Sequence, residues 1–228
     1  MTASRNRYLL VGTLAAMAAF VIVFGAIKLN EAKQKARQIS AYGRLSQMRL
    51  ALLLYEDEHG SLPPPTLRDE QGNPSHSWRT LILPYLGGHK FPPIPDLTQP
   101  WDSAINRNLI DGIPIDRWVW FNGGHTTISS PPATHILAYV DSNTNWVASS
   151  NLPSEATNQP PAAVLLIWVP TSNVHPLQPG DITELEVRQR VEAGEELLFI
   201  AAGEGSSYGL VSIEAGKLVF RDRTGVEH

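Results

Sequence analysis

Seven histidines are the first candidates for chemistry in this 228-residue chain, because histidine is a common metal ligand and general base. No pair has the His-x-x-x-His spacing that places two ligands on one helix face, and none is followed by the glutamate typical of zinc proteases. His125 and His135 are ten residues apart, and His76 precedes Trp78 at a predicted helix start, where it caps or packs. The sequence therefore predicts no metal site.

The segment Asp141–Trp146 (DSNTNW) has oxygen-bearing side chains at alternate positions, as in the first half of a calcium-binding loop. An EF-hand loop requires glycine at its sixth position, which is Trp146 here, and a glutamate six residues further on, which is missing. We interpret the segment as an asparagine-rich turn between two strands. Calcium binding by an irregular loop remains the alternative.

No catalytic constellation is visible in the sequence. The glycine-rich stretch Gly203–Gly209 lacks the lysine of a phosphate-binding P-loop, and no Gly-x-Ser-x-Gly motif is present. Serine, histidine and aspartate are too scattered for a triad to be argued. We therefore predict no catalytic residue, no cofactor and no enzymatic activity.

Six tryptophans could offer flat apolar surfaces to a glycan or small ligand. Such residues are more often part of a hydrophobic core, which is the interpretation that we favour. Exposed Trp118 or Trp120 would instead support the alternative function, a membrane-tethered binding module. The six are Trp78, Trp101, Trp118, Trp120, Trp146 and Trp168.

The element that must position all of these residues is an N-terminal helix. Tyr8–Ile27 contains no charged residue, and twenty residues of helix span roughly 30 Å, the hydrocarbon thickness of a bilayer. We predict a short tail over residues 1–7, a transmembrane helix over Tyr8–Ile27 and the lipid bilayer as its partner. A cleaved signal peptide is the alternative, although this apolar run is long and Val23–Ala26 is a poor cleavage site.

The helix is predicted to continue as a stem over residues 28–59, because helix-forming residues run without interruption to Gly60 and Pro63–Pro65. The apolar side chains of the stem recur mostly every three or four residues, which predicts one buried stripe. That stripe comprises Ala32, Ala36, Ile39, Leu45, Met48, Leu52 and Tyr55.

Residues 60–228 are predicted to form one α+β domain with an antiparallel sheet. The turn-rich segments 60–65 and 69–74 read as polar loop in which no core forms. Short helices are expected at His76–Leu86, limited by Pro84, and from Pro100 toward Leu109.

Six strands follow, and between them 149–161 and 171–180 are expected to be surface loops, with one or two helical turns over 182–191. Gly216 is expected to supply the positive φ of a hairpin between the last two strands. The predicted strands are Asp116–Phe121, Thr134–Val140, Ala162–Val169, Glu196–Ala201, Tyr208–Ile213 and Lys217–Arg221.

Charge is distributed unevenly along the chain. Residues 1–44 carry seven Lys or Arg and one Glu, whereas residues 45–228 carry 11 basic and 21 acidic residues. A domain with a net charge of −10 repels phosphate backbones, so nucleic acid is not an expected partner. The cations just after Ile27 lie where anionic lipid headgroups would be, although a merely solvated helix face explains them equally well. Cysteine is absent, which excludes disulfides.

Three blocks with matching order and spacing resemble a large pseudopilin-like family of unknown function that is abundant in planctomycetes. These are Leu45–Pro64, His76–Leu86 and Gln99–Ser103. Later segments, 134–140, 174–183 and 210–220, are similar to the later strands of that family. The resemblance covers nearly the whole chain from about Ala41.

The resemblance implies a type IV pilin-like fold, in which the outer half of a long helix packs across an antiparallel sheet. Two features depart from the family. The prepilin peptidase site and its glutamate are missing around Gly12–Met17, and the C-terminal His-x9-Asp-Gly motif is replaced by Gly205 and Ala215-Gly216. A permanently anchored protein that is neither processed nor polymerised is therefore expected.

The two indications of membrane orientation conflict. Two basic residues precede the apolar segment and five follow it, which places the domain in the cytoplasm by the positive-inside rule. The resemblance implies the opposite, and we follow it because long domains are translocated regardless of flanking charge. We expect a single-pass inner-membrane protein with a cytoplasmic N-terminus and a periplasmic or extracellular domain. Its expected role is structural or in interaction with a pseudopilin-like or envelope protein.

Overall fold

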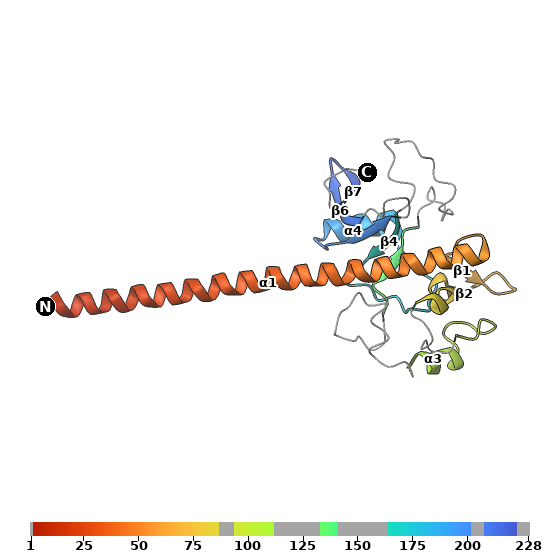
Figure 1. Cartoon of the computed structure of the whole chain (residues 1–228), viewed down its shortest axis with the longest axis horizontal. Coiled ribbons are helices and arrows are strands. Elements are labelled where there is room, and N and C mark those ends of the chain that lie inside the picture. Colours follow the sequence, from red (N-terminus) through yellow and green to blue (C-terminus); the bar gives the residue numbers. More distant parts are fainter. Residues whose placement is uncertain (1, 87–93, 112–132, 141–163, 202–207, 223–228) are drawn as a thin grey trace. The chain divides into compact units, whose positions relative to one another are not determined.

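The computed structural model describes residues 2–86, 94–111, 133–140, 164–201 and 208–222 (Figure 1). The side chains of residues 2–12, 15, 110–111, 164–165 and 222 lie outside this description. The chain divides into two compact units, Met1–Ile39 and Ser40–His228. Five stretches predicted from sequence, including the strand Asp116–Phe121, therefore lie wholly or mostly outside the described residues. The others are His125, Asp141–Trp146, the loop 149–161 and Gly203–Gly209.

Helix α1 (Thr2–His59) is continuous, as the uninterrupted run of helix-forming residues predicted. It ends where expected, because Gly60 adopts φ +76° and its amide donates to the carbonyl of Glu56 over 2.7 Å. Glycine has no Cβ penalty in this left-handed conformation and is therefore a common helix terminator.

Residues 13–37 of α1 are exposed all around the helix, wherever their side chains are described. Large apolar residues are prominent among them, including Phe20 at 69% and Ile22 at 71% exposure. Within the described residues, no helix is both long and apolar enough to cross a membrane. The predicted span Tyr8–Ile27 begins among residues whose side chains lie outside the description.

The second unit contains an antiparallel sheet of five strands in the order β3-β4-β5-β6-β7. The predicted α+β class is confirmed, and all five strands fall within runs that the sequence predicted or extend them by one residue. Their bounds are β3 Ile136–Ala138, β4 Val164–Trp168, β5 Leu198–Ala201, β6 Tyr208–Glu214 and β7 Lys217–Asp222.

The two faces of this sheet enter two different hydrophobic clusters. Leu166, Leu198 and Ile200 belong to the cluster that contains Leu45 and Leu52 of α1. Their neighbours along the same strands point the other way, because side chains alternate across a strand. Those neighbours include Ile167 and Phe199, which belong to one cluster with Val211 of β6 and Val187 of helix α4 (Glu184–Glu192).

The predicted buried stripe of α1 is correct only from Ala41 onward. Leu45, Met48 and Leu52 are at most 1% exposed, and each such burial contributes roughly 1.5–3 kcal/mol. Ile39, however, is 62% exposed, and Ala32 and Ala36 are exposed as well. Helical spacing continues across these positions, but the residues that bury the stripe belong to the second unit, which begins at Ser40.

The segment after α1 contains structure that the sequence did not predict. Strands β1 (Thr66–Arg68) and β2 (Pro74–Ser77) pair in an antiparallel hairpin. Leu62 is only 8% exposed and joins the cluster of Leu45, so the prediction that no core forms in 60–65 is wrong. Proline-rich backbone does not prevent a single leucine from reaching the core.

Four short helical elements are described in the domain: three follow the hairpin, and the fourth lies between strands β4 and β5. Helix α2 (Trp78–Leu81) is capped by Ser77, and the 3-10 helix η1 (Leu83–Tyr85) contains Pro84, as expected of a helix shortened by proline. Helix α3 (Ala104–Asp111) begins four residues after Pro100. Helix α4 has a capping box in which Thr183 and Glu186 bond each other's backbone amides.

The β6–β7 hairpin turn places both Ala215 (φ 47°) and Gly216 (φ 76°) in the left-handed region. The sequence predicted this conformation for Gly216 alone. Two consecutive positive φ values are typical of a type I′ turn, for which Asn-Gly and Asp-Gly are the favoured pairs. The turn is held against α4, because Arg188 donates from Nη1 to the carbonyl of Gly216 over 2.9 Å.

Candidate functional site

The tryptophans that the structure describes are mainly core residues. Trp78 is fully buried and Trp168 is 4% exposed, which confirms the core interpretation for both. Trp101 is half-buried beside the core, with its ring centroid 5.1 Å from that of His175. Trp118 and Trp120, on which the ligand-binding alternative depends, lie outside the described residues together with Trp146.

The described histidines and carboxylates do not gather into a metal site. No cluster of three or more His, Asp or Glu residues that could hold a metal ion occurs in that part of the chain. His76 is buried, and its Nε2 donates to the carbonyl of Gln99 over 2.7 Å, since a carbonyl can only accept. This contact is the packing role predicted for His76.

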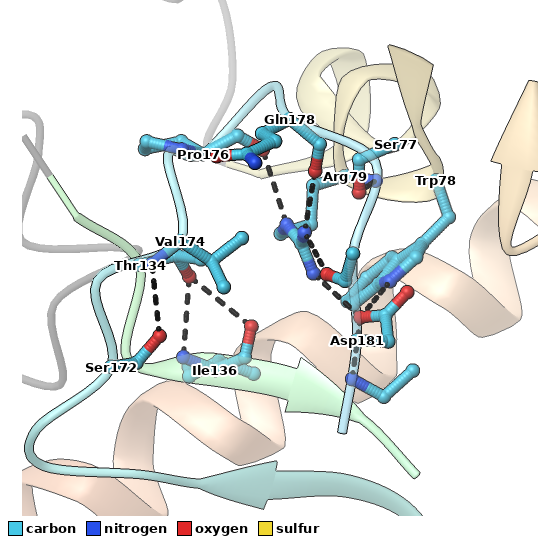
Figure 2. Close-up of polar contacts among 12 residues, drawn as sticks. Ser77, Trp78, Arg79, Thr134, Ile136, Ser172, Val174, Pro176, Gln178 and Asp181 are labelled. Carbon is cyan, nitrogen blue, oxygen red and sulfur yellow. Dashed lines mark hydrogen bonds and ion pairs between the residues drawn. The ribbon is translucent and has the colours of Figure 1, made fainter. Parts of the chain in front are cut away.

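The most organised polar cluster is a buried group that we call the Arg79 centre: Arg79, Asp181, Trp78 and the carbonyls of Pro176, Gln178 and Gly180. Figure 2 shows the guanidinium of Arg79 enclosed by these groups. Arg79 donates from Nε to Pro176 over 3.1 Å and from Nη2 to Gln178 over 3.0 Å and to Gly180 over 2.8 Å. Its Nη1 donates to Asp181 Oδ1 over 2.8 Å, so four of the five N–H donors of arginine are used.

Asp181 is the acidic member of the Arg79 centre. Its Oδ1 accepts hydrogen bonds from three donors: Arg79, the indole Nε1 of Trp78 at 3.1 Å and the backbone amide of Ala138 at 2.8 Å (Figure 2). The side chains of Arg79 and Asp181 are 0% and 4% exposed. A charged pair removed from water in this way is tolerated only when its remaining hydrogen bonds are also satisfied.

The Arg79 centre fastens three separate segments of the domain. Arg79 lies in α2, Asp181 follows it by 102 residues, and Ala138 lies in β3. Additional backbone bonds join the same segments, from Ser77 to the carbonyl of Leu177 over 3.0 Å and from Ile182 to the carbonyl of Ala138 over 2.9 Å. The predicted surface loop 171–180 therefore contains a buried clamp, in which Leu177 is 1% exposed.

The chemical role of the Arg79 centre is limited by its burial and by its bonds to protein groups. Protein groups accept hydrogen bonds from four of the five N–H donors of Arg79 and donate three to Oδ1 of Asp181, and neither side chain reaches solvent to a useful extent. A group must contact a substrate to act as acid, base or anchor. The Arg79 centre is therefore a structural clamp that fixes α2 and the 176–181 segment against the edge strand β3.

A second buried polar residue, Asn106 in α3, organises the backbone after the hairpin. Its Nδ2 donates to the carbonyls of Asp96, Gln99 and Pro100 over 3.0, 3.2 and 2.9 Å, and its Oδ1 accepts from the amide of Asp96 over 2.8 Å. Gln99 also accepts the bond from His76. The side-chain hydrogen bond from Thr98, followed by that from the backbone of Thr98, lowers the pKa of Asp96.

An aromatic cluster lies at the C-terminal end of α1. Tyr55 stacks on His59 with centroids 4.0 Å apart and meets Tyr85 edge-on at 6.0 Å. The hydroxyl of Tyr85 donates to Glu58 Oε2 over 2.7 Å, and this hydrogen bond is the main cause that raises the pKa of Tyr85 to about 12. The cluster joins η1 to the last turn of α1.

Comparison with known proteins gives one match. The model of a family described as a protein of unknown function (DUF1559) matches residues 30–134, which include the second half of α1, the β1–β2 hairpin, α2 and α3. The match is consistent with the resemblance inferred from sequence, and the description of the family does not mention pilins. No curated protein and no solved structure matches the chain.

The Arg79 centre was missed from the sequence, although both of its halves stood in segments that carry the family resemblance. His76–Leu86 and Val174–Thr183 contain Arg79 and Asp181, respectively. Their separation along the chain leaves no periodicity that could reveal the pairing. The available signal was an arginine inside an otherwise apolar helical segment, since a buried arginine requires a partner.

Proposed function

We propose that this chain is a membrane-anchored, type IV pilin-like structural or interaction protein of the cell envelope, without catalytic activity. The N-terminal part of α1 would hold the protein in the inner membrane. The domain that begins at Ser40 would stand outside the cytoplasm and contact a pseudopilin-like or envelope partner. A pilin-like arrangement is supported by the α1 residues from Ala41 onward, which share a core with an antiparallel sheet.

The observation that carries this proposal is the exposed apolar surface of α1 before Ser40. Its large hydrophobic residues are 51–71% exposed between Leu14 and Leu29. Soluble monomers rarely expose a contiguous apolar surface larger than a few hundred Å². A lipid environment would satisfy these side chains, because a helix that is apolar on all sides is buried in a large core or in a membrane.

The buried polar groups of the domain support a structural role. Arg79, Asp181 and Asn106 direct their donors and acceptors to protein groups, mostly backbone, rather than toward a surface. Such an arrangement specifies one backbone conformation, as expected of a module whose function is to present a shape.

Flotation of the full-length protein with phosphatidylcholine vesicles tests the anchor. We expect the wild-type chain to float and to resist extraction by salt. The variant Val21→Lys/Phe24→Lys should remain in the soluble fraction, because each lysine at the centre of a membrane helix costs about 2.5–3.5 kcal/mol. A monodisperse monomer in detergent-free buffer would contradict the proposal.

The matched control is Ser46→Lys/Leu50→Lys, which adds the same charge at two exposed positions of the same helix, outside the apolar segment. This control should float like the wild type. For orientation, the absence of cysteine permits a single reporter at exposed Lys217. Labelling of Lys217→Cys on intact spheroplasts by a membrane-impermeant maleimide would support an extracytoplasmic domain, and labelling only after lysis would place the domain in the cytoplasm.

A further inference from the structure

A second feature of the first unit is a collar of cations, which we define as Lys28, Lys33, Lys35 and Arg37. All four side chains are exposed, and Glu31 is the one acidic residue in the first 44. Lys28 pairs with Glu31 over 2.8 Å, and among the described residues this is the only ion pair formed by the collar. The collar therefore carries a net charge of about +3 on roughly 14 Å of helix.

We infer that the collar binds the phosphate groups of anionic phospholipids at the surface of the membrane. This inference rests on the proposed anchor, because Lys28 immediately follows the last residue of the apolar segment, Ile27. Lys28 to Lys35 span about 10 Å along the helix, which is comparable with the Debye length at physiological salt. These cations therefore lie within the distance over which an anionic surface attracts them.

The contacts of Lys28 fit a position at the boundary between lipid tails and headgroups. Its Nζ lies 5.7 Å from the ring centroid of Phe24 and 2.8 Å from Glu31 Oε2, with the side chain 57% exposed. The hydrocarbon stem of lysine follows apolar surface while the ammonium turns toward water or phosphate. Lys33, Lys35 and Arg37, about one and a half to two and a half turns further on, remain available for anionic ligands.

The charge pattern favours lipid over a second copy of α1. Parallel helices in register would bring the cations of two collars together, which is repulsive. A second copy offers one acidic surface, its domain of net charge −10 over residues 45–228. The collar, however, directly adjoins the apolar segment and thus lies at the level of the headgroups, so the lipid is the nearer and denser source of negative charge.

The test uses the full-length chain with a donor fluorophore on Ala32→Cys, an exposed position in a protein without cysteine. Vesicles of phosphatidylcholine and phosphatidylglycerol contain a trace of acyl-chain-labelled acceptor, which is either of the two lipids. We expect stronger transfer to phosphatidylglycerol at low salt, with a preference above roughly fivefold, because one cation near an anionic surface contributes about that factor and the collar has a net charge of about +3.

Lys33→Gln/Lys35→Gln should lower this preference severalfold, because the change reduces the net charge of the collar from about +3 to about +1. Arg107→Gln/Lys217→Gln is the matched control, which removes the same charge from exposed positions of the domain and should leave the preference unchanged. Equal transfer to both lipids in the wild type would refute the binding of anionic lipid by the collar. If the chain still floats with phosphatidylcholine vesicles, the proposed membrane anchor would remain supported.

Two further outcomes separate the inference from the proposed function. In the first, the wild-type chain does not float with phosphatidylcholine vesicles but binds phosphatidylglycerol vesicles in a salt-sensitive way, and Lys33→Gln/Lys35→Gln loses this binding. That result would support anionic lipid binding by the collar and refute the proposed membrane anchor. In the second, energy transfer occurs between donor-labelled and acceptor-labelled copies of the chain in neutral vesicles, is salt-sensitive, and is not accompanied by a preference for phosphatidylglycerol. That result would show that the collar binds the acidic domain of a second copy and not lipid.

Discussion

The two units of this protein differ in which side chains they expose and which they bury. Residues 1–39 expose large apolar side chains, with Phe20 at 69% and Ile22 at 71% exposure, whereas the domain buries a charged pair, Arg79 at 0% and Asp181 at 4%. The first arrangement is costly in water and the second is costly in any core. The first unit thus exposes the kind of side chain that the domain buries, whereas the domain bonds its buried arginine and aspartate to its own groups.

The strongest test of this comparison is a pair of substitutions on α1. Leu52→Asp should unfold the domain, because an unpaired charge would be placed in a core position that is 1% exposed, and we expect a loss on the order of 4–5 kcal/mol or more. Leu50→Asp, at a position 56% exposed, should change stability by about 0.5 kcal/mol or less. Chemical denaturation in detergent, followed by tryptophan fluorescence, measures both. Equal midpoints for Leu52→Asp and the wild type would refute this assignment of the core.

The second test removes one charge from the Arg79 centre. Arg79→Met should destabilise the domain by about 3–5 kcal/mol, because it leaves Asp181 buried without its counter-ion. The surface pair formed by Arg221 and Glu214, with side chains 48% and 42% exposed, provides the matched control. Arg221→Met should cost about 1 kcal/mol or less, since exposed pairs are weak. Similar losses for the two variants would show that the buried centre is not a clamp.

A smaller effect, of opposite sign, is expected at the β6–β7 turn. Ala215 has a positive φ, which costs a non-glycine residue roughly 1 kcal/mol. Ala215→Gly or Ala215→Asn should therefore raise the free energy of unfolding by about 0.5–1 kcal/mol. Ala193→Gly, at a helix end with φ −74°, serves as the control and should lower it. Destabilisation by both changes at Ala215 would argue against a type I′ turn.

The smallest expected effect is a pH dependence at the end of α1. The pKa of Tyr85 is raised from its ordinary value of 10.0 to about 12, chiefly by the hydrogen bond to Glu58. The folded state thus favours the neutral phenol, and the contribution is complete below pH 10 and disappears as the pH rises to about 12. Tyr85→Phe should show a shallower loss of stability over that interval in urea titrations, and the same slope in both proteins would contradict this reasoning. Solvent screening keeps the effect small.

Much of the domain could be predicted from the sequence because its strands are apolar runs between Gly, Pro and Asn. Strands β3–β7 follow that pattern. The hairpin β1–β2 was missed because three- and four-residue strands among prolines and glycines carry no recognisable alternation. The exposure of Ile39 was mispredicted for another reason: helical spacing identifies a face, but only a neighbouring element decides whether that face is covered.

The candidate site could be predicted only in fragments. The cation collar is a property of local sequence and was visible from charge alone. The Arg79 centre was invisible, because its halves are 102 residues apart and its remaining acceptors are backbone carbonyls, which every residue possesses. The type of side chain therefore indicated that Arg79 needed a partner, without indicating which one.

The sequence by itself determined the long helix, its charge-free N-terminal run, the cations that follow it and the α+β character of the domain. Each of these is a local property, fixed by composition and by spacing along a few helical turns or strand residues. Only the tertiary structure decided where the buried face of α1 begins and that Asp181 is the partner of Arg79. Both depend on contacts between residues distant in sequence, and such contacts are defined only once the chain has folded.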